Sequence, residues 1–328
     1  MNRGAKSGRA RLRAALLAAG LAFAGASGAA FAQGWPARPI RIVVAYQPGG
    51  PADVIGRAIA PRLGERLGQP VAVENRPGAS GNLGMEAVVR AAPDGHTLLL
   101  GVNALVINPL FYKLSFDPRT DLIAAAPLVE YHLALAANPA LGVRGPQELV
   151  EKMRREPGRV TCATSGGQTL IACEMLASLA GAQLQMVPYK SISAMRQDLA
   201  GGFVDLVFDA PDALAPLVLD GRARVLGIAG PARRDPQLGE LASLESVLPG
   251  LDLTSWLALM APARTPAAIL RRLAEETAAI LQEPAIRQRI ADMGGRAITL
   301  SPQAFAEYLG RQARRYEALA RERGLRGE

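Results

Sequence analysis

Apolar and polar positions follow two alternating patterns along the chain. Residues 40–44, Ile-Arg-Ile-Val-Val, form the apolar, β-branched run expected of a buried strand. After the turn Pro48-Gly49-Gly50-Pro51, apolar residues recur at helical spacing from Asp53 onward. The same order of elements repeats as a strand at 71–74, a helix at 82–92 and a strand at 97–101. Because short apolar strands alternate with longer helices, we expect an α/β fold with a largely parallel sheet.

A second series of the same kind follows a transition near residues 133–139. Its expected strands are 159–164, 185–187, 204–208 and 224–229, and its expected helices are 146–155, 170–179, 194–200 and 211–220. One more apolar strand, at 253–260, precedes three helices that begin at Pro266, Pro284 and Pro302. No strand is expected after these helices begin.

This order of elements predicts two domains joined by two crossing segments. We expect a discontinuous first domain, residues 33–137 with 253–328, in which the C-terminal helices pack back on the first sheet. Residues 138–252 form the expected second domain, and the chain is long enough for two separate cores. Two crossings give a hinge that is suited to closing on a ligand.

Each expected domain has a glycine-rich turn between a strand and a helix. Gly49 and Gly50 precede the first helix, and Ser165-Gly166-Gly167 follows the strand at 159–164. The first amides of a helix lack an intrahelical acceptor, and glycine lets the backbone approach a ligand closely, so such turns suit anions. The alternative is a pair of tight connections that bind nothing. In an α/β sheet both turns would lie at the carboxyl ends of the strands, where ligands bind.

The first 32 residues have the organisation of a secretory signal peptide. Five basic residues and no acid precede an apolar run at 14–24, and the segment ends in Ala30-Phe31-Ala32. We expect cleavage between Ala32 and Gln33 and a soluble exported protein. Removal of this segment lowers the formal net charge from +8 to 8 − 5 = +3. No basic patch with interleaved aromatic residues remains, so nucleic acid is not an expected partner.

The sequence offers few reactive groups for catalysis. Its only histidines, His96 and His132, lie in expected strands without Cys, Asp or Glu at metal-ligand spacing. Ser165 lacks the glycine two residues earlier that a hydrolase nucleophile elbow requires. The Gly49-Gly50 turn is not followed by a Walker-type lysine. We therefore expect no enzyme activity, no metal site and no cofactor.

Several polar residues near the expected turns have more than one interpretation. Asp53 complements the dipole of the first helix, or it orders the glycine turn or accepts a hydrogen bond from a ligand or a bridging water. Lys190 is either a counter-charge for a carboxylate or a solvated turn residue. Tyr46 and Tyr189 either face a ligand or pack in the core. Asp209 is a further acid at the end of an expected strand.

The two cysteines, Cys162 and Cys173, flank the second glycine turn. In an oxidising compartment an even count permits one disulfide, which would close a small ring and rigidify the turn. Two buried free thiols are the alternative, because the geometry between a strand and the following helix often misses the Cα separation that a disulfide requires.

A series of short motifs carries a family resemblance. In order they are Trp35-Pro-Ala-Arg-Pro-Ile-Arg-Ile-Val-Val, Pro48-Gly-Gly-Pro-Ala-Asp53, Val73-Glu-Asn-Arg-Pro-Gly-Ala-Ser-Gly-Asn82, Pro93-Asp-Gly-His-Thr-Leu-Leu, Val187-Pro-Tyr-Lys190, Asp198-Leu-Ala-Gly-Gly and Val204-Asp-Leu-Val-Phe-Asp209. Together they cover essentially the whole mature chain and resemble the Bug family, the periplasmic solute-binding receptors of tripartite tricarboxylate transporters.

The resemblance implies a two-domain periplasmic binding protein of the type II, or Venus-flytrap, fold that closes over a small carboxylate. In this family the carboxylate is held largely by backbone amides and ordered water from two turns. The ligand-binding residues expected here are Tyr46, Pro48, Gly49, Gly50, Asp53, Ser80, Thr164, Ser165, Gly166, Gly167, Tyr189, Lys190 and Asp209. Tyr46, Leu170 and Ser191 stand where the family usually has phenylalanine, histidine and glycine.

The expected function is that of a non-catalytic periplasmic receptor. We expect a monomer that binds a small organic carboxylate between its domains and delivers it to the membrane subunits of a tripartite tricarboxylate transporter. The alternative is a sensor module that uses the same cleft and passes its ligand state to a signalling partner. The sequence does not distinguish the two.

Overall fold

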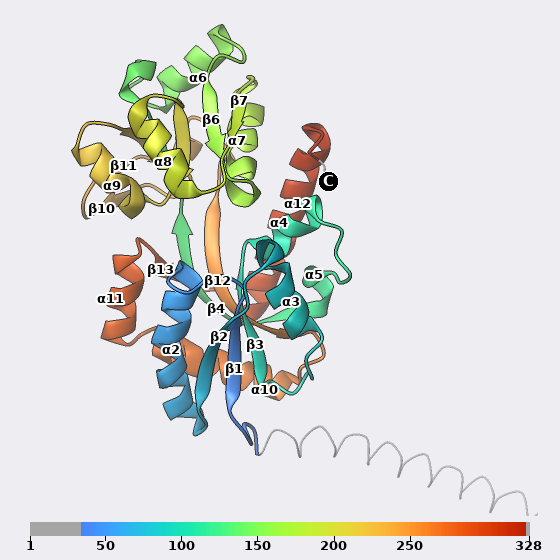
Figure 1. The fold of residues 1–328 in the computed structure, drawn as a ribbon. Helices are drawn as coiled ribbons and strands as arrows, with labels where there is room; N and C mark the ends of the chain where they lie inside the picture. Colours follow the sequence, from blue (N-terminus) through green and yellow to red (C-terminus); the bar gives the residue numbers. More distant parts are fainter. Residues whose placement is uncertain (1–33, 326–328) are drawn as a thin grey trace, which may run out of the picture.

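The computed structural model describes residues 34–325, in which two lobes, each built on one β-sheet, are stacked end to end (Figure 1). The expected signal peptide, residues 1–32, and its cleavage site therefore lie outside the described residues. Within residues 34–325, no helix combines the length and the apolar composition needed to cross a membrane.

The first lobe is built on a six-stranded sheet with the strand order β13-β4-β12-β3-β1-β2. Its strands are β1 (Ile40–Val44), β2 (Val71–Asn75), β3 (Thr97–Val102), β4 (Leu122–His132), β12 (Thr254–Pro262) and β13 (Arg296–Ala297). β1 pairs in parallel with β2 and β3, whereas β12 runs antiparallel to β3 and β4. β13 pairs with β4, although the sequence predicts no strand in this region, because a strand of two residues leaves no apolar run to detect.

The second lobe is built on a five-stranded sheet with the order β7-β6-β8-β5-β9. Its strands are β5 (Ala134–Ala137), β6 (Thr161–Thr164), β7 (Gln185–Pro188), β8 (Leu206–Asp209) and β9 (Arg224–Ile228), and a separate hairpin consists of β10 (Arg233–Asp235) and β11 (Gly239–Leu241). β5 pairs with β8 and β9. It therefore belongs to the sheet of the second lobe, although it precedes the expected boundary at residue 137.

Both sheets are mixed rather than largely parallel, because β5 and β12 enter them directly from the other lobe. β5 follows β4 after a single residue, Leu133, and β12 begins after Leu253. The parallel strands β1 and β6 end on the side of their sheet that faces the other lobe. A strand that enters from that side runs in the opposite direction, so both entering strands are antiparallel to their neighbours.

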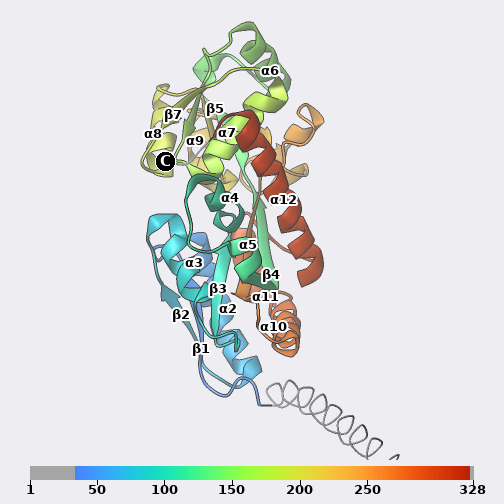
Figure 2. The same ribbon diagram turned by 90° about the vertical axis from the view of Figure 1, so that its right-hand side faces the viewer.

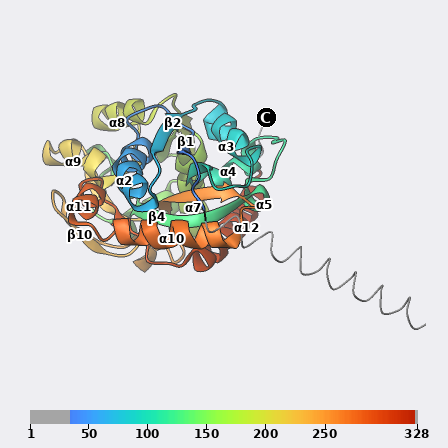
Figure 3. The ribbon, with the colours of Figure 1, turned by 90° about the horizontal axis from the view of Figure 1, so that it is seen from below.

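Helices cover both faces of the first sheet (Figure 3). α2 (Pro51–Leu67), α10 (Ala267–Ile280) and α11 (Pro284–Asp292) pack on one face, and α3 (Asn82–Val89) and the start of α12 (Pro302–Glu322) pack on the other. The remaining helices are α4 (Ala104–Phe111), α5 (Pro118–Asp121), α6 (Pro146–Arg155), α7 (Gly167–Ala180), α8 (Ile192–Gly201) and α9 (Pro211–Leu219). The sequence did not predict α4, because a short, mostly apolar run with Pro109 inside it does not distinguish a helix from a buried strand.

α12 packs on the first lobe, as expected, and also reaches the second (Figure 2). Near its start, Phe305 makes an edge-to-face contact with Trp256 of β12, with ring centroids 5.2 Å apart. Farther along, Tyr316 belongs to the core of the second lobe. Beyond the helix end, Arg323 pairs with Glu174 of α7 at 2.8 Å. A helix of 21 residues is about 30 Å long, which is sufficient to contact both lobes.

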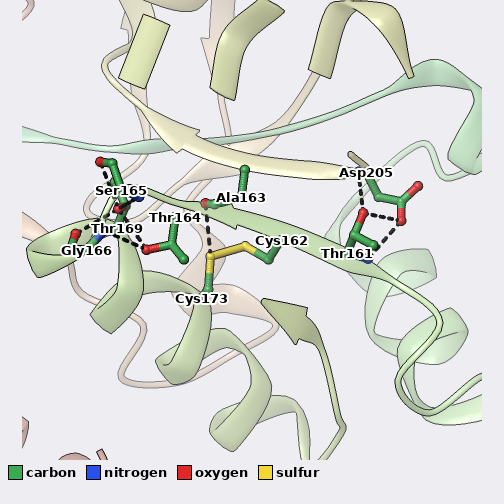
Figure 4. The surroundings of a disulfide bond; sticks show 9 residues. All are labelled: Thr161, Cys162, Ala163, Thr164, Ser165, Gly166, Thr169, Cys173 and Asp205. Carbon is green, nitrogen blue, oxygen red and sulfur yellow. Dashed lines mark hydrogen bonds between the residues drawn. A yellow bond between two sulfur atoms is a disulfide. The ribbon is translucent and has the colours of Figure 1, made fainter. Parts of the chain in front are cut away.

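Cys162 of β6 and Cys173 of α7 form a disulfide, with their Cα atoms 6.1 Å apart (Figure 4). Of the two alternatives that the sequence leaves open, the bridge is therefore the one observed. The bond joins the strand and the helix that flank the glycine turn at residues 165–167. It therefore restrains the two ends of that turn.

The first prediction concerns this bond. The double substitution C162A/C173A should lower the free energy of unfolding by about 3 kcal/mol, because the unfolded chain is no longer closed into a small loop. Urea denaturation with and without reductant measures the effect. Reductant should destabilise the wild type by a similar amount and leave the double variant unchanged. Two titratable thiols in the denatured, unreduced wild type would contradict the bridge.

A second prediction concerns two helical glycines that should respond oppositely to alanine. A Cβ at Gly84 of α3 would lie 2.6 Å from the Cβ and 2.7 Å from the Cα of Ala45. Because backbone cannot move aside cheaply, Gly84→Ala should destabilise the fold by about 1–3 kcal/mol. At Gly310 of α12 the nearest atom is Arg314 Nη1 at 3.5 Å, so Gly310→Ala should stabilise it by about 0.5–1 kcal/mol. Urea denaturation compares the two, and a stabilised Gly84→Ala protein would refute the packing argument.

Candidate ligand-binding cavity

A cavity of about 430 Å³ lies between the two lobes. Its lining consists of Tyr46, Gly50, Pro51, Ala52, Asp53, Ser80, Val102, Asn103, Ala104, Ile107 and Asn108 from the first lobe, Tyr131 and Leu257 from β4 and β12, and Ser165, Gly166, Gly167 and Gln168 from the second lobe. Seven of the expected site residues are brought together here, namely Tyr46, Gly50, Asp53, Ser80, Ser165, Gly166 and Gly167. Among these lining residues of the described chain, Asp53 carries the only formal charge, and none is a lysine, arginine or histidine.

Asp53 holds the glycine turn of the first lobe in place. Its carboxylate accepts hydrogen bonds from the Gly49 backbone N–H at 2.9 Å, from Asn75 Nδ2 at 2.9 Å and from Arg57 Nε at 3.0 Å. The side chain is buried, and the hydrogen bond from Arg57 is the main cause that lowers the pKa of Asp53 to about 2. Of the interpretations left open by the sequence, this geometry favours ordering of the turn. Pro48 and Gly49 belong to the same turn but not to the cavity lining.

A second loop of the first lobe, around Ser80, is held by hydrogen bonds with the side chains of Tyr46, Asn108 and Tyr112. The Ser80 carbonyl accepts from Asn108 Nδ2 at 2.9 Å and from the Tyr46 hydroxyl at 3.4 Å, and Ser80 Oγ lies 2.6 Å from the Tyr112 hydroxyl. Ala79 and Ser80 both have positive φ, at 47° and 55°, a conformation that is costly for residues with a Cβ. These hydrogen bonds offset that cost. Burial raises the pKa of Tyr46 to about 12, so its hydroxyl is a neutral donor at neutral pH.

The glycine turn of the second lobe is shaped by two threonine hydroxyls (Figure 4). The Gly166 N–H donates to Thr164 Oγ1 at 3.0 Å, and the Ser165 N–H donates to Thr169 Oγ1 at 2.9 Å. Gly166 has φ +83° and Gly167 has φ +52°, which glycine adopts without steric cost. Thr164 is buried beneath the turn and does not line the cavity. The turn therefore presents Ser165, Gly166 and the first residue of α7 to the cavity, with Thr164 as a support.

Tyr189, Lys190 and Asp209 lie outside the cavity lining. The Tyr189 hydroxyl donates to Asp198 Oδ2 at 2.7 Å, and the Lys190 side chain is exposed. Asp209 accepts from Arg196 Nη1 at 2.7 Å, and burial raises its pKa despite this partner. These three residues therefore contact their own lobe or solvent in this conformation.

Two of the positions that depart from the family pattern also lie outside the lining. Leu170 is half-buried in α7, and Ser191 is the N-cap of α8, where its hydroxyl accepts from the Ala194 N–H at 3.3 Å. A serine at this cap satisfies an otherwise free helix amide. Tyr46 is the departure that reaches the cavity.

The sequence did not predict ten of the lining residues, namely Pro51 and Ala52 of α2, Gln168 of α7, and the seven that come from the end of β3, α4 and the two crossing strands. Asn103 illustrates their role, since its Nδ2 donates to the Thr254 carbonyl at 2.9 Å and its Oδ1 accepts from the Trp256 N–H at 2.8 Å. It thereby fastens the end of β3 to β12. The only sequence signal for Tyr131 and Leu257 is that they lie in the apolar runs 122–132 and 254–262. A strand that crosses between the lobes must pass the cavity between them, so some of its residues line that cavity.

The histidines have no part in the cavity. His96 and His132 are both buried, and burial lowers the pKa of His132 to about 4. Within residues 34–325, no group of three or more His, Cys, Asp or Glu side chains is placed to hold a metal ion.

A third prediction follows from the hydrogen bonds of Asp53. Asp53→Asn should lower the free energy of unfolding at pH 7 by about 2 kcal/mol, because the pKa of this carboxyl falls from 3.8 to about 2 on folding. A lowered pKa stabilises the fold above about pH 4, and this stabilisation is lost as the pH falls towards about 2. The stability of the variant should therefore change less over that range. Urea denaturation at several pH values measures it.

Asp220→Asn is the matched control, because Asp220 is exposed at the end of α9. Its stability and pH dependence should follow those of the wild type. An equal loss of unfolding free energy in both variants would show that the hydrogen bonds of Asp53 to Gly49, Arg57 and Asn75 add nothing to stability beyond what an exposed carboxylate adds.

Comparison with known proteins places these features in a family. Residues 55–325 match the family described as tripartite tricarboxylate transporter family receptor. The chain is 38% identical over 288 residues to a UPF0065 protein of Bordetella bronchiseptica, in an alignment that covers 87% of this chain and 85% of that protein. Among solved structures, R. palustris Rpa4515 with adipate is similar with a TM-score of 0.74 and 29% identity, covering 90% of this chain and 100% of that one. The periplasmic binding protein BugD is similar with a TM-score of 0.71 and 26% identity, covering 90% and 100%.

These similarities confirm the expected fold and the expected absence of catalysis. The chain has the α/β two-domain fold of periplasmic binding proteins, with mixed sheets and a C-terminal helix. The matched family consists of periplasmic binding proteins and not of enzymes. The chain belongs to the family of tripartite tricarboxylate transporter receptors.

Proposed function

We propose that this receptor binds a small organic carboxylate in the cavity between its lobes and delivers it to the membrane subunits of a tripartite tricarboxylate transporter. The observation that carries the proposal is that the first turns of α2 and α7, one from each lobe, line the same cavity. The first amides of a helix have no intrahelical acceptor, and the helix dipole favours an anion beside them.

The composition of the lining supports a carboxylate that is bound without an ion pair. Since the lining has no cationic side chain, backbone amides and hydroxyls are the groups that would hold the negative charge. Val102, Ile107 and Leu257 offer an apolar surface for the body of the ligand. The relative Rpa4515 was solved with adipate, which supports the same ligand class.

The expected site residues divide into two groups in this proposal. The ligand contacts are Tyr46, Gly50, Ser80, Ser165, Gly166 and Gly167. The residues that position the two turns are Pro48, Gly49, Asp53 and Thr164. Tyr189, Lys190 and Asp209 have no direct role in the conformation described here.

We propose that closure moves two domains about the crossing segments. The first comprises residues 33–133 with 253–328, and the second comprises residues 134–252, which differs from the expectation by including β5 with its sheet. A ligand that favours the closed form by a few kcal/mol shifts the population strongly. We also propose that the mature chain begins at Gln33 in the periplasm, after signal-peptide cleavage.

A ligand screen by thermal unfolding tests the carboxylate. Adipate, malate, glutamate, citrate and benzoate are compared with neutral sugars at the same concentration. A bound acid at a hundred times its Kd should stabilise the protein by about 2.7 kcal/mol, which raises the Tm by about 4 °C for a chain of this size. Mass spectrometry of the ligand released from native protein identifies the natural ligand. Stabilisation by sugars alone would overturn the proposal.

Two matched glycine variants test the second-lobe turn as part of the site. Gly166 has φ +83° and ψ −174°, a region that only glycine occupies readily. Gly166→Ala should therefore displace the turn and weaken carboxylate binding about tenfold or more in calorimetric titration. Gly142→Ala is the control, since Gly142 also has positive φ and open space but lies in an exposed turn away from the cavity. Unchanged affinity in Gly166→Ala would remove this turn from the site.

A further inference from the structure

We propose that Gln168 selects the ligand of this receptor, favouring a carboxylate that also carries a neutral hydrogen-bond donor, such as a hydroxyl or amide group, over one that carries a second carboxylate. The proposal rests on the proposed carboxylate-binding function. It concerns the part of the cavity where α7 approaches β4 and β12.

The side chain of Gln168 extends from the second lobe to the crossing strands. Its Nε2 donates to Ser255 Oγ at 2.7 Å, and Ser255 is only 1% exposed. Ser255 lies directly opposite Tyr131 in the ladder of β12 with β4, so these two side chains project from the same face of the strand pair. Gln168 and Tyr131 both line the cavity. The amide of Gln168 is therefore anchored at a fixed position beside the Tyr131 ring.

In the other two amide side chains of the lining, both polar atoms of Asn103 and the nitrogen of Asn108 are already bonded to the protein. Asn103 uses both its oxygen and its nitrogen to hold β12, and Asn108 Nδ2 donates to the Ser80 carbonyl and to Asn82 Oδ1. The carboxylate of Asp53 has three donors. These groups would lose existing bonds on turning to a ligand.

Gln168 keeps both a second N–H and its Oε1 beside the N–H that bonds Ser255, whereas Asn108 keeps only its Oδ1. Within residues 34–325, no hydrogen-bond donor reaches Gln168 Oε1. Gln168 as a whole is half-buried and lines the cavity, so a ligand that brings a donor to this oxygen gains a bond. A ligand without one leaves the acceptor unpaired when the cavity closes. A site of this kind discriminates strongly against analogues that lack the hydrogen-bonding group.

Charge in this part of the cavity disfavours a second carboxylate. Burial raises the pKa of Tyr131, a hydrogen bond with Ser255 lowers it, and the charges of Asp209 and Asp212 raise it by smaller amounts. The negative potential that opposes ionisation of this phenol also opposes a ligand carboxylate beside it. Arg196 pairs with Asp209, but no cationic residue reaches the lining itself. A second carboxylate would therefore be desolvated without a counter-charge, which is costly.

Calorimetric titration with two sets of matched acids tests the proposal. One set is 5-hydroxypentanoate, pentanoate and glutarate, and the other is 4-hydroxybenzoate, benzoate and terephthalate. In at least one set, the wild type should bind the hydroxy acid about tenfold more tightly than both the unsubstituted acid and the dicarboxylate. In Gln168→Leu, the ratio of the affinity for the hydroxy acid to the affinity for the unsubstituted acid should fall to about one, and this ratio is the readout because the substitution also alters the lining itself.

Two further variants separate selection from a general loss of the site. Ser255→Ala removes the anchor of Gln168 and should reduce the affinity ratio of hydroxy acid to unsubstituted acid by several-fold. Gln185→Leu, on the exposed face of β7, should leave the ranking unchanged. A dicarboxylate preferred by the wild type in both sets, or a ranking that survives in Gln168→Leu, overturns the role of Gln168 and leaves carboxylate binding intact. If no carboxylate binds the wild type, the proposed function fails and this inference fails with it.

Discussion

The antiparallel pairing of β4 with β12 is the constraint on which the arrangement of the two lobes depends. The ladder runs from Thr254 opposite His132 to Pro262 opposite Leu122, and every residue of β12 is buried. Both strands continue directly into the crossings, so the direction in which they leave the first sheet sets the position of the second lobe. The register shifts at two points, opposite Leu257/Ala258 and Leu259/Met260 of β12, where β4 has one extra residue each time. The same strands bring Tyr131 and Leu257 to the cavity.

The two walls of the cavity are held rigid by different chemistry. In the first lobe, the buried charge of Asp53 gathers donors from the turn, from α2 and from β2, and charge-assisted bonds of this kind are strong when desolvated. In the second lobe, hydroxyls of Thr164 and Thr169 bond the turn, and a disulfide closes the strand and helix below it. Both turns are thus formed before a ligand arrives, and little ordering cost is left to binding.

Local signals made the two turns predictable. The part of the cavity lining formed by Tyr131 and Leu257, its floor, depends on distant parts of the chain. Gly49-Gly50 and Gly166-Gly167 each sit between a strand and a helix, and that order can be read within about twenty residues of sequence. Tyr131 and Leu257 become neighbours only because β4 pairs with β12 across more than a hundred intervening residues. The periodicity of the sequence does not indicate which distant strands pair with each other. Asn103 and Asn108 were missed for a related reason, since they belong to or adjoin α4, whose short, mostly apolar sequence does not distinguish a helix from a buried strand.

The position of α12 connects the floor of the cavity, through β12, to a helix that packs on both lobes. Neighbouring residues of a strand project to opposite faces, so Leu257 lines the cavity while Trp256 faces α12. The Trp256 Nε1–H donates to Gln312 of α12 at 3.0 Å, and Tyr316, one turn later, lies in the core of the second lobe. A ligand that shifts Leu257 therefore displaces the adjoining backbone on which α12 rests. Because α12 is packed on both lobes, the closure that we propose would either bend this strand pair or move α12 against the second lobe, and in both cases the cavity and α12 would change together.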